Sequence, residues 1–129
     1  MRIKILLPFL CVLLVGCDKK PIALEGLDLA QWENDKFGCN GYRKKQIKLI
    51  ELNKDDLLKY SEKEIVKMLG VPNETELIDR SEKYYIYTID GGSKCNKESR
   101  DQVIYLRLRF NSLGYSKEVL ILVEKYNNT

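Results

Sequence analysis

A change in hydrophobic spacing at Gly70 is the feature that most constrains the fold. Before this glycine, Ser61 and Glu64 have the spacing of a capping box, in which each side chain accepts a hydrogen bond from a free N–H at a helix start. Apolar residues then follow at positions i, i+3 and i+4: Ile65, Met68 and Leu69. Gly70, with Pro72 beyond it, is typical of a helix end. The sequence therefore predicts a short helix over residues 61–69.

After Pro72 the spacing becomes that of β-strands. Val103–Phe110 alternates cleanly between apolar and polar residues, and Lys83–Ile89 and Glu118–Val123 are rich in β-branched and aromatic residues. The links contain turn sequences, Asp90–Gly92 and Asn111–Gly114. Short links between successive strands favour an antiparallel meander. The prediction is an α+β domain with N-terminal helices packed on one face of a three-stranded antiparallel sheet.

Two further helical segments are expected before the capping box. Asp28 can cap a short helix that carries Trp32 and ends by Gly38, and Tyr42–Asn53 is rich in helix formers. Trp32, the only tryptophan, is either a core anchor, which is the more common role, or an exposed binding residue. A basic cluster lies in the second segment and is interpreted as a solvated helix face rather than a binding patch: Arg43, Lys44, Lys45 and Lys48.

The strand pattern also offers a candidate partner surface. An outward stripe of tyrosines and arginines is expected on the sheet: Tyr85, Tyr87, Tyr105, Arg107 and Arg109. Tyrosine and arginine are enriched at protein interfaces. The alternative is an ordinary amphipathic sheet face exposed to water.

The N-terminal segment has the pattern of an export signal. Arg2 and Lys4 precede a twelve-residue apolar stretch, Ile5–Gly16. Because a spanning helix needs roughly 20 apolar residues, this stretch is too short for a transmembrane helix. Its ending, Leu14–Cys17, resembles the lipobox of bacterial lipoproteins, although an ordinary cleaved signal is the alternative.

The lipobox resemblance implies three segments. Residues 1–16 would be the signal peptide, residues 17–26 a lipidated tether and residues 27–129 a single domain. Cys17 would be acylated and would anchor the chain in a bacterial membrane, since more than one acyl chain gives stable attachment. Asp18 leaves open whether this is the outer membrane or the periplasmic face of the inner membrane.

Residues 55–123 resemble a family of small lipoproteins. The capped helix ending in Leu-Gly-x-Pro (Ser61–Pro72) and the RFNSLG sequence between the last two strands (Arg109–Gly114) are similar to BamE-type (SmpA/OmlA) lipoproteins. That family shares its plan of helices on an antiparallel sheet with β-lactamase-inhibitor-protein-like domains. The resemblance implies a non-catalytic accessory subunit of outer-membrane assembly. The preceding WENDKFGCNGYR stretch, residues 32–43, instead resembles uncharacterised small lipoproteins of Bacteroidetes-type bacteria.

Two of the four cysteines remain once Cys11 is removed with the signal segment and Cys17 is assigned to lipidation. Cys39 and Cys95 form an even pair in an exported domain, and this arrangement predicts a disulfide. A reactive thiol is the alternative, because nearby lysines could lower a thiol pKa: Lys36, Lys94 and Lys97. Neither cysteine has an accompanying base or a Cys-x-x-Cys motif.

The composition argues against catalysis. The chain has no histidine, so the usual general base and zinc ligand are missing. The carboxylates lack a paired acid/base spacing: Asp55, Asp56, Asp90 and Asp101. We therefore expect no catalytic residue, no metal, no cofactor and no small-molecule substrate. Removing Arg2 and Lys4 with the signal lowers the formal net charge by two from +3, which leaves little support for nucleic-acid binding.

The predicted function follows from these points. We expect a lipid-anchored, non-catalytic protein of the cell envelope that serves as an interaction module, with a protein partner there and a role in outer-membrane assembly or maintenance. The alternative is an inhibitor or immunity-type lipoprotein that blocks an exported enzyme.

Overall fold

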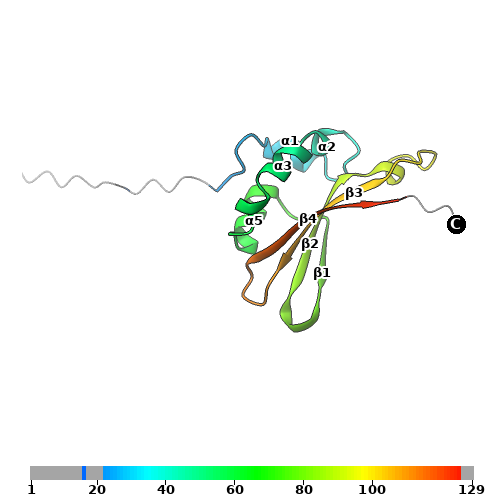
Figure 1. The fold of residues 1–129 in the computed structure, drawn as a ribbon. Helices are drawn as coiled ribbons and strands as arrows, with labels where there is room; N and C mark the ends of the chain where they lie inside the picture. The colour runs from blue at the N-terminus through cyan, green and yellow to red at the C-terminus, as the bar shows by residue number, and fades with distance from the viewer. Residues whose placement is uncertain (1–15, 17–21, 126–129) are drawn as a thin grey trace, which may run out of the picture.

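The computed structural model describes residue 16 and residues 22–125, and Figure 1 shows the arrangement of the elements. The helices come first along the chain: α1 Leu29–Asn34, α2 Tyr42–Lys45, α3 Ile47–Leu52, α4 Lys54–Leu57 and α5 Glu62–Leu69. The strands follow: β1 Glu74–Leu77, β2 Lys83–Asp90, β3 Val103–Phe110 and β4 Ser116–Glu124, with 3₁₀ turns η1 Asp79–Ser81 and η2 Gly92–Lys94. The predicted combination of helices and an antiparallel sheet is confirmed.

The sheet has four strands, whereas three were predicted. Its order is β1-β2-β3-β4, and every neighbouring pair is antiparallel. The additional strand, β1, has the sequence ETEL, and all four of its residues are exposed. A four-residue edge strand with no buried face has no alternation of apolar and polar side chains. This is why the sequence pattern missed it.

The predicted capping box of α5 is present. Ser61 N donates to the Glu64 carboxylate at 2.8 Å, and Glu64 N donates to the Ser61 hydroxyl at 3.4 Å. The helix ends at Gly70, where φ is +73°. This left-handed value suits a residue without a side chain.

Residues from both the helices and the sheet make up the hydrophobic core. Its buried members come from every helix except α2 and from β2, β3 and β4: Trp32, Ile50, Leu57, Ile65, Met68, Leu69, Tyr87, Ile89, Leu106, Leu108, Phe110 and Val119. In Figure 1 the helices lie together to one side of the strands. Leu24 also joins the core, so the packed domain begins earlier than residue 27, within the segment predicted to be a tether.

Two predictions for the second helical segment are corrected. The helix expected over Tyr42–Asn53 is divided at Gln46 into α2 and α3, and the backbone N–H of Gln46 donates to Arg43 O at 3.0 Å. The basic cluster is not a uniformly solvated face, because Arg43 is only 2% exposed. Arg43 is buried because its hydrogen-bond acceptors lie outside its own helix. A prediction made from the residues of that helix alone does not include them.

Candidate functional site

Each residue of the predicted partner stripe can be assigned to a face of the sheet. In the β2–β3 register, Tyr85 lies opposite Leu108 and Tyr87 opposite Leu106, both of which are core residues. Tyr87 is fully buried. Tyr105, Arg107 and Arg109 occupy the alternate positions of β3 and remain partly exposed. The expected single stripe is therefore divided between two faces.

The prediction of which β2 residues face outward was wrong, because both faces of this strand carry large side chains. Tyr84 and Ile86 lie opposite Arg109 and Arg107, whereas the sequence interpretation had placed Tyr85 and Tyr87 there. A one-residue change of phase moves a whole strand to the other face of the sheet. With tyrosines at both odd and even positions, the alternation in β2 does not choose between the two phases.

We define the outer face as the sheet surface opposite the core. Its members come from all four strands: Glu74, Glu76, Tyr84, Ile86, Tyr105, Arg107, Arg109, Glu118, Leu120, Leu122 and Glu124. A hollow of about 260 Å³ lies on it, between β1 on one side and β4 on the other. Lys94 of η2 also lines this hollow. This volume is slightly below the roughly 300–1,000 Å³ of most small-molecule sites.

Charge and aromatic contacts organise the outer face. The Arg107 guanidinium lies 4.3 Å from the centre of the Tyr84 ring, and its Nη2 is 3.9 Å from a Glu118 oxygen. Lys94 Nζ donates to the Tyr105 hydroxyl at 2.5 Å. This hydrogen bond raises the pKa of Lys94, which is therefore a cation at neutral pH. The outer face thus combines aromatic and aliphatic area with positioned cations.

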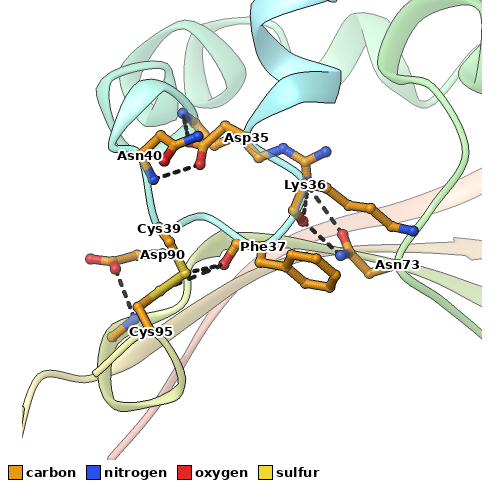
Figure 2. The surroundings of a disulfide bond; sticks show 10 residues. Asp35, Lys36, Phe37, Cys39, Asn40, Asn73, Asp90 and Cys95 are labelled. Carbon is orange, nitrogen blue, oxygen red and sulfur yellow. Dashed lines mark hydrogen bonds between the residues drawn. A yellow bond between two sulfur atoms is a disulfide. The ribbon is translucent and has the colours of Figure 1, made fainter. Parts of the chain in front are cut away.

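The predicted disulfide is present. Cys39 and Cys95 are bonded, with Cα atoms 5.5 Å apart and a sequence separation of 56 residues. Figure 2 shows the bond next to Phe37 and Asp90. A Cβ atom at Gly91 would collide with Cys95 Sγ, so the disulfide packs directly against the backbone of this glycine. The reactive-thiol alternative does not apply to a bonded pair.

A buried arginine, which sequence analysis missed, connects this region to the core. Arg43 Nε donates to Trp32 O at 2.8 Å, and its Nη1 donates to Lys36 O at 3.1 Å, Asn73 Oδ1 at 3.0 Å and Thr88 O at 3.0 Å. The guanidinium also lies 4.6 Å from the centre of the Trp32 ring. Burial lowers the pKa of Arg43, and the charge of nearby Asp35 opposes this effect. These contacts join α1, α2 and β2.

Trp32 itself has a core role, as the more common of its two alternatives predicted. Its side chain is fully buried, and Nε1 donates to Leu69 O at 2.8 Å. Tyr87 makes a similar contact, because its hydroxyl donates to Gly70 O at 2.8 Å. Together they satisfy two carbonyls at the end of α5.

The remaining predictions concern the anchor, metal binding and Asp90. Cys17 and Asp18 lie outside the described residues. Across residues 22–125 and at Gly16, no helix is long and apolar enough to cross a membrane. The same part of the chain contains no cluster of three or more metal-ligating side chains. Asp90 accepts from Gly92 N at 2.9 Å within the turn after β2, and it pairs with Lys44 of α2 at 3.1 Å.

The fold and surface define an α+β protein with a four-stranded antiparallel sheet, whose outer face carries tyrosine, arginine and glutamate side chains. No protein-family model matches the sequence, and comparison with curated proteins and with solved structures gives no match.

Proposed function

We propose that this chain is a lipid-anchored, non-catalytic accessory protein of the bacterial cell envelope, which binds a protein partner through the outer face. Anchoring would use acylated Cys17, on the evidence of the lipobox-like Leu14–Cys17 sequence. The helices would cover one side of the sheet and leave the other side for the partner. Outer-membrane assembly or maintenance is the role that the BamE-like motifs favour.

The observation that carries this proposal is the composition of the outer face. Arg107 contacts the Tyr84 ring and lines the hollow with Tyr105, Ile86 and Leu122. Interfaces are enriched in tyrosine and arginine, and binding energy concentrates in such residues when they are surrounded by other contacts. The Tyr84 ring already holds the Arg107 guanidinium in position, which lowers the entropy lost on binding.

Site-specific photo-crosslinking in native membranes tests the binding surface. A photoreactive residue at position 105 of the full chain is expected to capture a discrete envelope protein. The matched control is position 115, because Tyr115 is an exposed tyrosine on the β3–β4 turn, away from the hollow. Equal capture at both positions, or capture at neither, would contradict the proposal. Capture of an exported enzyme whose activity falls on binding would support the inhibitor role instead.

The anchor has a separate test. In Cys17→Ser the acylated thiol is absent, so the chain is expected to move from the membrane fraction to the soluble fraction. Cys11→Ser, within the signal segment, is the control and should leave fractionation unchanged. Membrane association of the Cys17→Ser variant equal to that of the unsubstituted chain would exclude anchoring at Cys17.

A further inference from the structure

Among residues 22–125, no strand pairs with the outer edge of β4. The sheet ends at β1 on one side and β4 on the other, and Figure 1 shows both strands. Only the start of β4 is covered, where Ser116 N donates to Tyr60 O at 3.0 Å. Beyond Ser116, no other segment among residues 22–125 is hydrogen-bonded to this edge.

The two edges differ in how they are protected. Proteins usually blunt exposed edges with short strands, charges or prolines. β1 follows this rule, because it has four residues and two of them are glutamates. β4 has nine residues, and its central stretch Val119–Val123 contains no charge, proline or glycine. Such an edge readily pairs with another strand.

The sequence of this edge is a palindrome. Lys117–Lys125 reads KEVLILVEK in both directions, with Ile121 at its centre. In an antiparallel pair, directly opposite residues point to the same side of the sheet. Two copies of β4 related by a two-fold axis at Ile121 therefore place identical residue types opposite each other. Val119 lies opposite the second copy's Val123, and Leu120 opposite its Leu122.

The side chains on both faces of β4 are compatible with this pairing. Val119, Ile121 and Val123 lie across from Leu108, Leu106 and Ile104 on the core side. Leu120 and Leu122 lie across from Arg107 and Tyr105 on the outer face. Pairing about Ile121 thus sets β-branched residues against β-branched residues on one side and leucines against leucines on the other. Apolar side chains would therefore face apolar side chains on both sides of the joined sheet.

We infer that the chain forms a two-fold symmetric dimer in which β4 pairs with β4 of a second copy, centred on Ile121. The partner is a second copy because a palindromic strand is complementary to itself in an antiparallel pair. The result is one continuous sheet that runs from β1 of one copy to β1 of the other, with both outer faces on the same side. This inference goes beyond the proposed function and does not depend on the lipid anchor.

The charged residues at the two ends of β4 make the affinity of the dimer depend on salt concentration. Glu118 would lie opposite the second copy's Glu124, and Lys117 opposite its Lys125, so like charges meet at each end. Like charges directly opposite one another are destabilising, and salt screens exposed charges. The dimer is therefore expected to bind more tightly as salt is added, and weaker binding with added salt would contradict this pairing.

Cysteine crosslinking of the full-length chain in detergent tests the register. In Ile121→Cys the two new thiols meet at the two-fold axis, where directly opposite Cα atoms are about 4.5–5.5 Å apart. In Val123→Cys the two thiols are offset by four residues, or about 13 Å, which no disulfide spans. Val123 is 52% exposed, whereas Ile121 is partly buried. Random collision, or two chains sharing one micelle, would thus favour crosslinking at position 123.

The expected result is a covalent dimer for Ile121→Cys and only the background of the unsubstituted chain for Val123→Cys. Crosslinking at position 123 equal to or above that at 121 would overturn the inference, as would no dimer for either. Because position 121 contributes to the core, a second pair of variants leaves it unchanged. Val123→Lys should weaken dimerisation at least tenfold in sedimentation measurements. Val71→Lys, at a valine that is 76% exposed, should have no effect. A monomeric unsubstituted chain, or equal effects of both variants, would also overturn the inference.

Discussion

Replacing Arg43 with alanine is expected to lower the free energy of unfolding by about 3–5 kcal/mol. The substitution removes the hydrogen bonds from Arg43 to four acceptors, the carbonyls of Trp32, Lys36 and Thr88 and the side-chain oxygen of Asn73. Two of these acceptors keep another donor, because Asn73 Nδ2 donates to Lys36 O and Thr88 N donates to Asn73 Oδ1. A buried acceptor left unsatisfied costs about 1–3 kcal/mol, and removing one member of a buried charged network costs about 3–5 kcal/mol. The expected loss is about 3–5 kcal/mol and not four times the cost of one acceptor, because Lys36 O and Asn73 Oδ1 each keep a second donor and both residues are partly exposed to water.

Urea unfolding measures this change. With a slope of about 1.5–2 kcal/mol per molar urea, typical of a small domain, a loss of about 3–5 kcal/mol moves the midpoint down by about 1.5–3 M. Far-ultraviolet circular dichroism is the appropriate signal, because Arg43 lies over the Trp32 ring and its removal changes the fluorescence of the folded state. Arg43→Lys keeps the charge but not the planar fork of donors. Its urea midpoint should therefore lie between those of the unsubstituted chain and Arg43→Ala.

The neighbouring basic residue supplies the matched control. Lys44 pairs with Asp90 at 3.1 Å, but its side chain is 62% exposed. Because exposed ion pairs contribute at most about 1 kcal/mol, Lys44→Ala should change the midpoint little. A loss below about 1 kcal/mol for Arg43→Ala, or a loss no greater than that of Lys44→Ala, would show that the buried hydrogen bonds of Arg43 do not stabilise the packing of α1, α2 and β2.

Three further measurements test other parts of the structure. Replacing Cys39 and Cys95 together with serine should lower the free energy of unfolding by about 4 kcal/mol on the chain-entropy model for a separation of 56 residues, and a loss below 1 kcal/mol in chemical denaturation would contradict it. Ser61→Ala removes the cap of α5 and should cost about 1 kcal/mol, whereas an unchanged midpoint would show that the capping box contributes nothing. Burial, together with a hydrogen bond to Glu62, raises the pKa of Tyr85 from 10.0 to about 12, so the unfolded chain ionises first and stability should fall as pH rises from about 10 to about 12. Tyr85→Phe should make this fall shallower in a pH series of unfolding curves, and an identical pH dependence would contradict the shift.

The elements that the sequence predicted well are those whose signals are local. The capping box of α5 needs only residues three apart, and β3 alternates from Ile104 to Phe110 in sequence. The disulfide followed from an even number of cysteines, which is a matter of counting. In each case the information lies within a few residues or in composition, so no knowledge of tertiary contacts was required.

The features that the sequence did not predict depend on distant contacts. The phase of β2 is fixed by its register against β3, since its tyrosines suit either face. Arg43 has the same local context as Lys44, yet its acceptors come from β2 and from Asn73, thirty residues away. The strand β1 forms only because β2 offers an edge to pair with. Tertiary structure decides these points, and local propensity does not.

The outer face and the disulfide are physically linked through one short turn. Cys95 follows Lys94 directly, and Lys94 contributes the cation that rests on the Tyr105 hydroxyl and lines the hollow. The bond to Cys39 fixes the end of this turn against Phe37 and Gly91, so the position of Lys94 depends on the bridge. Without the bridge, Lys94 would have to find Tyr105 from a longer and freer loop, at a greater cost in conformational entropy. The bridge therefore does more than stabilise the fold, because it also holds one of the charged groups with which the outer face would meet a partner.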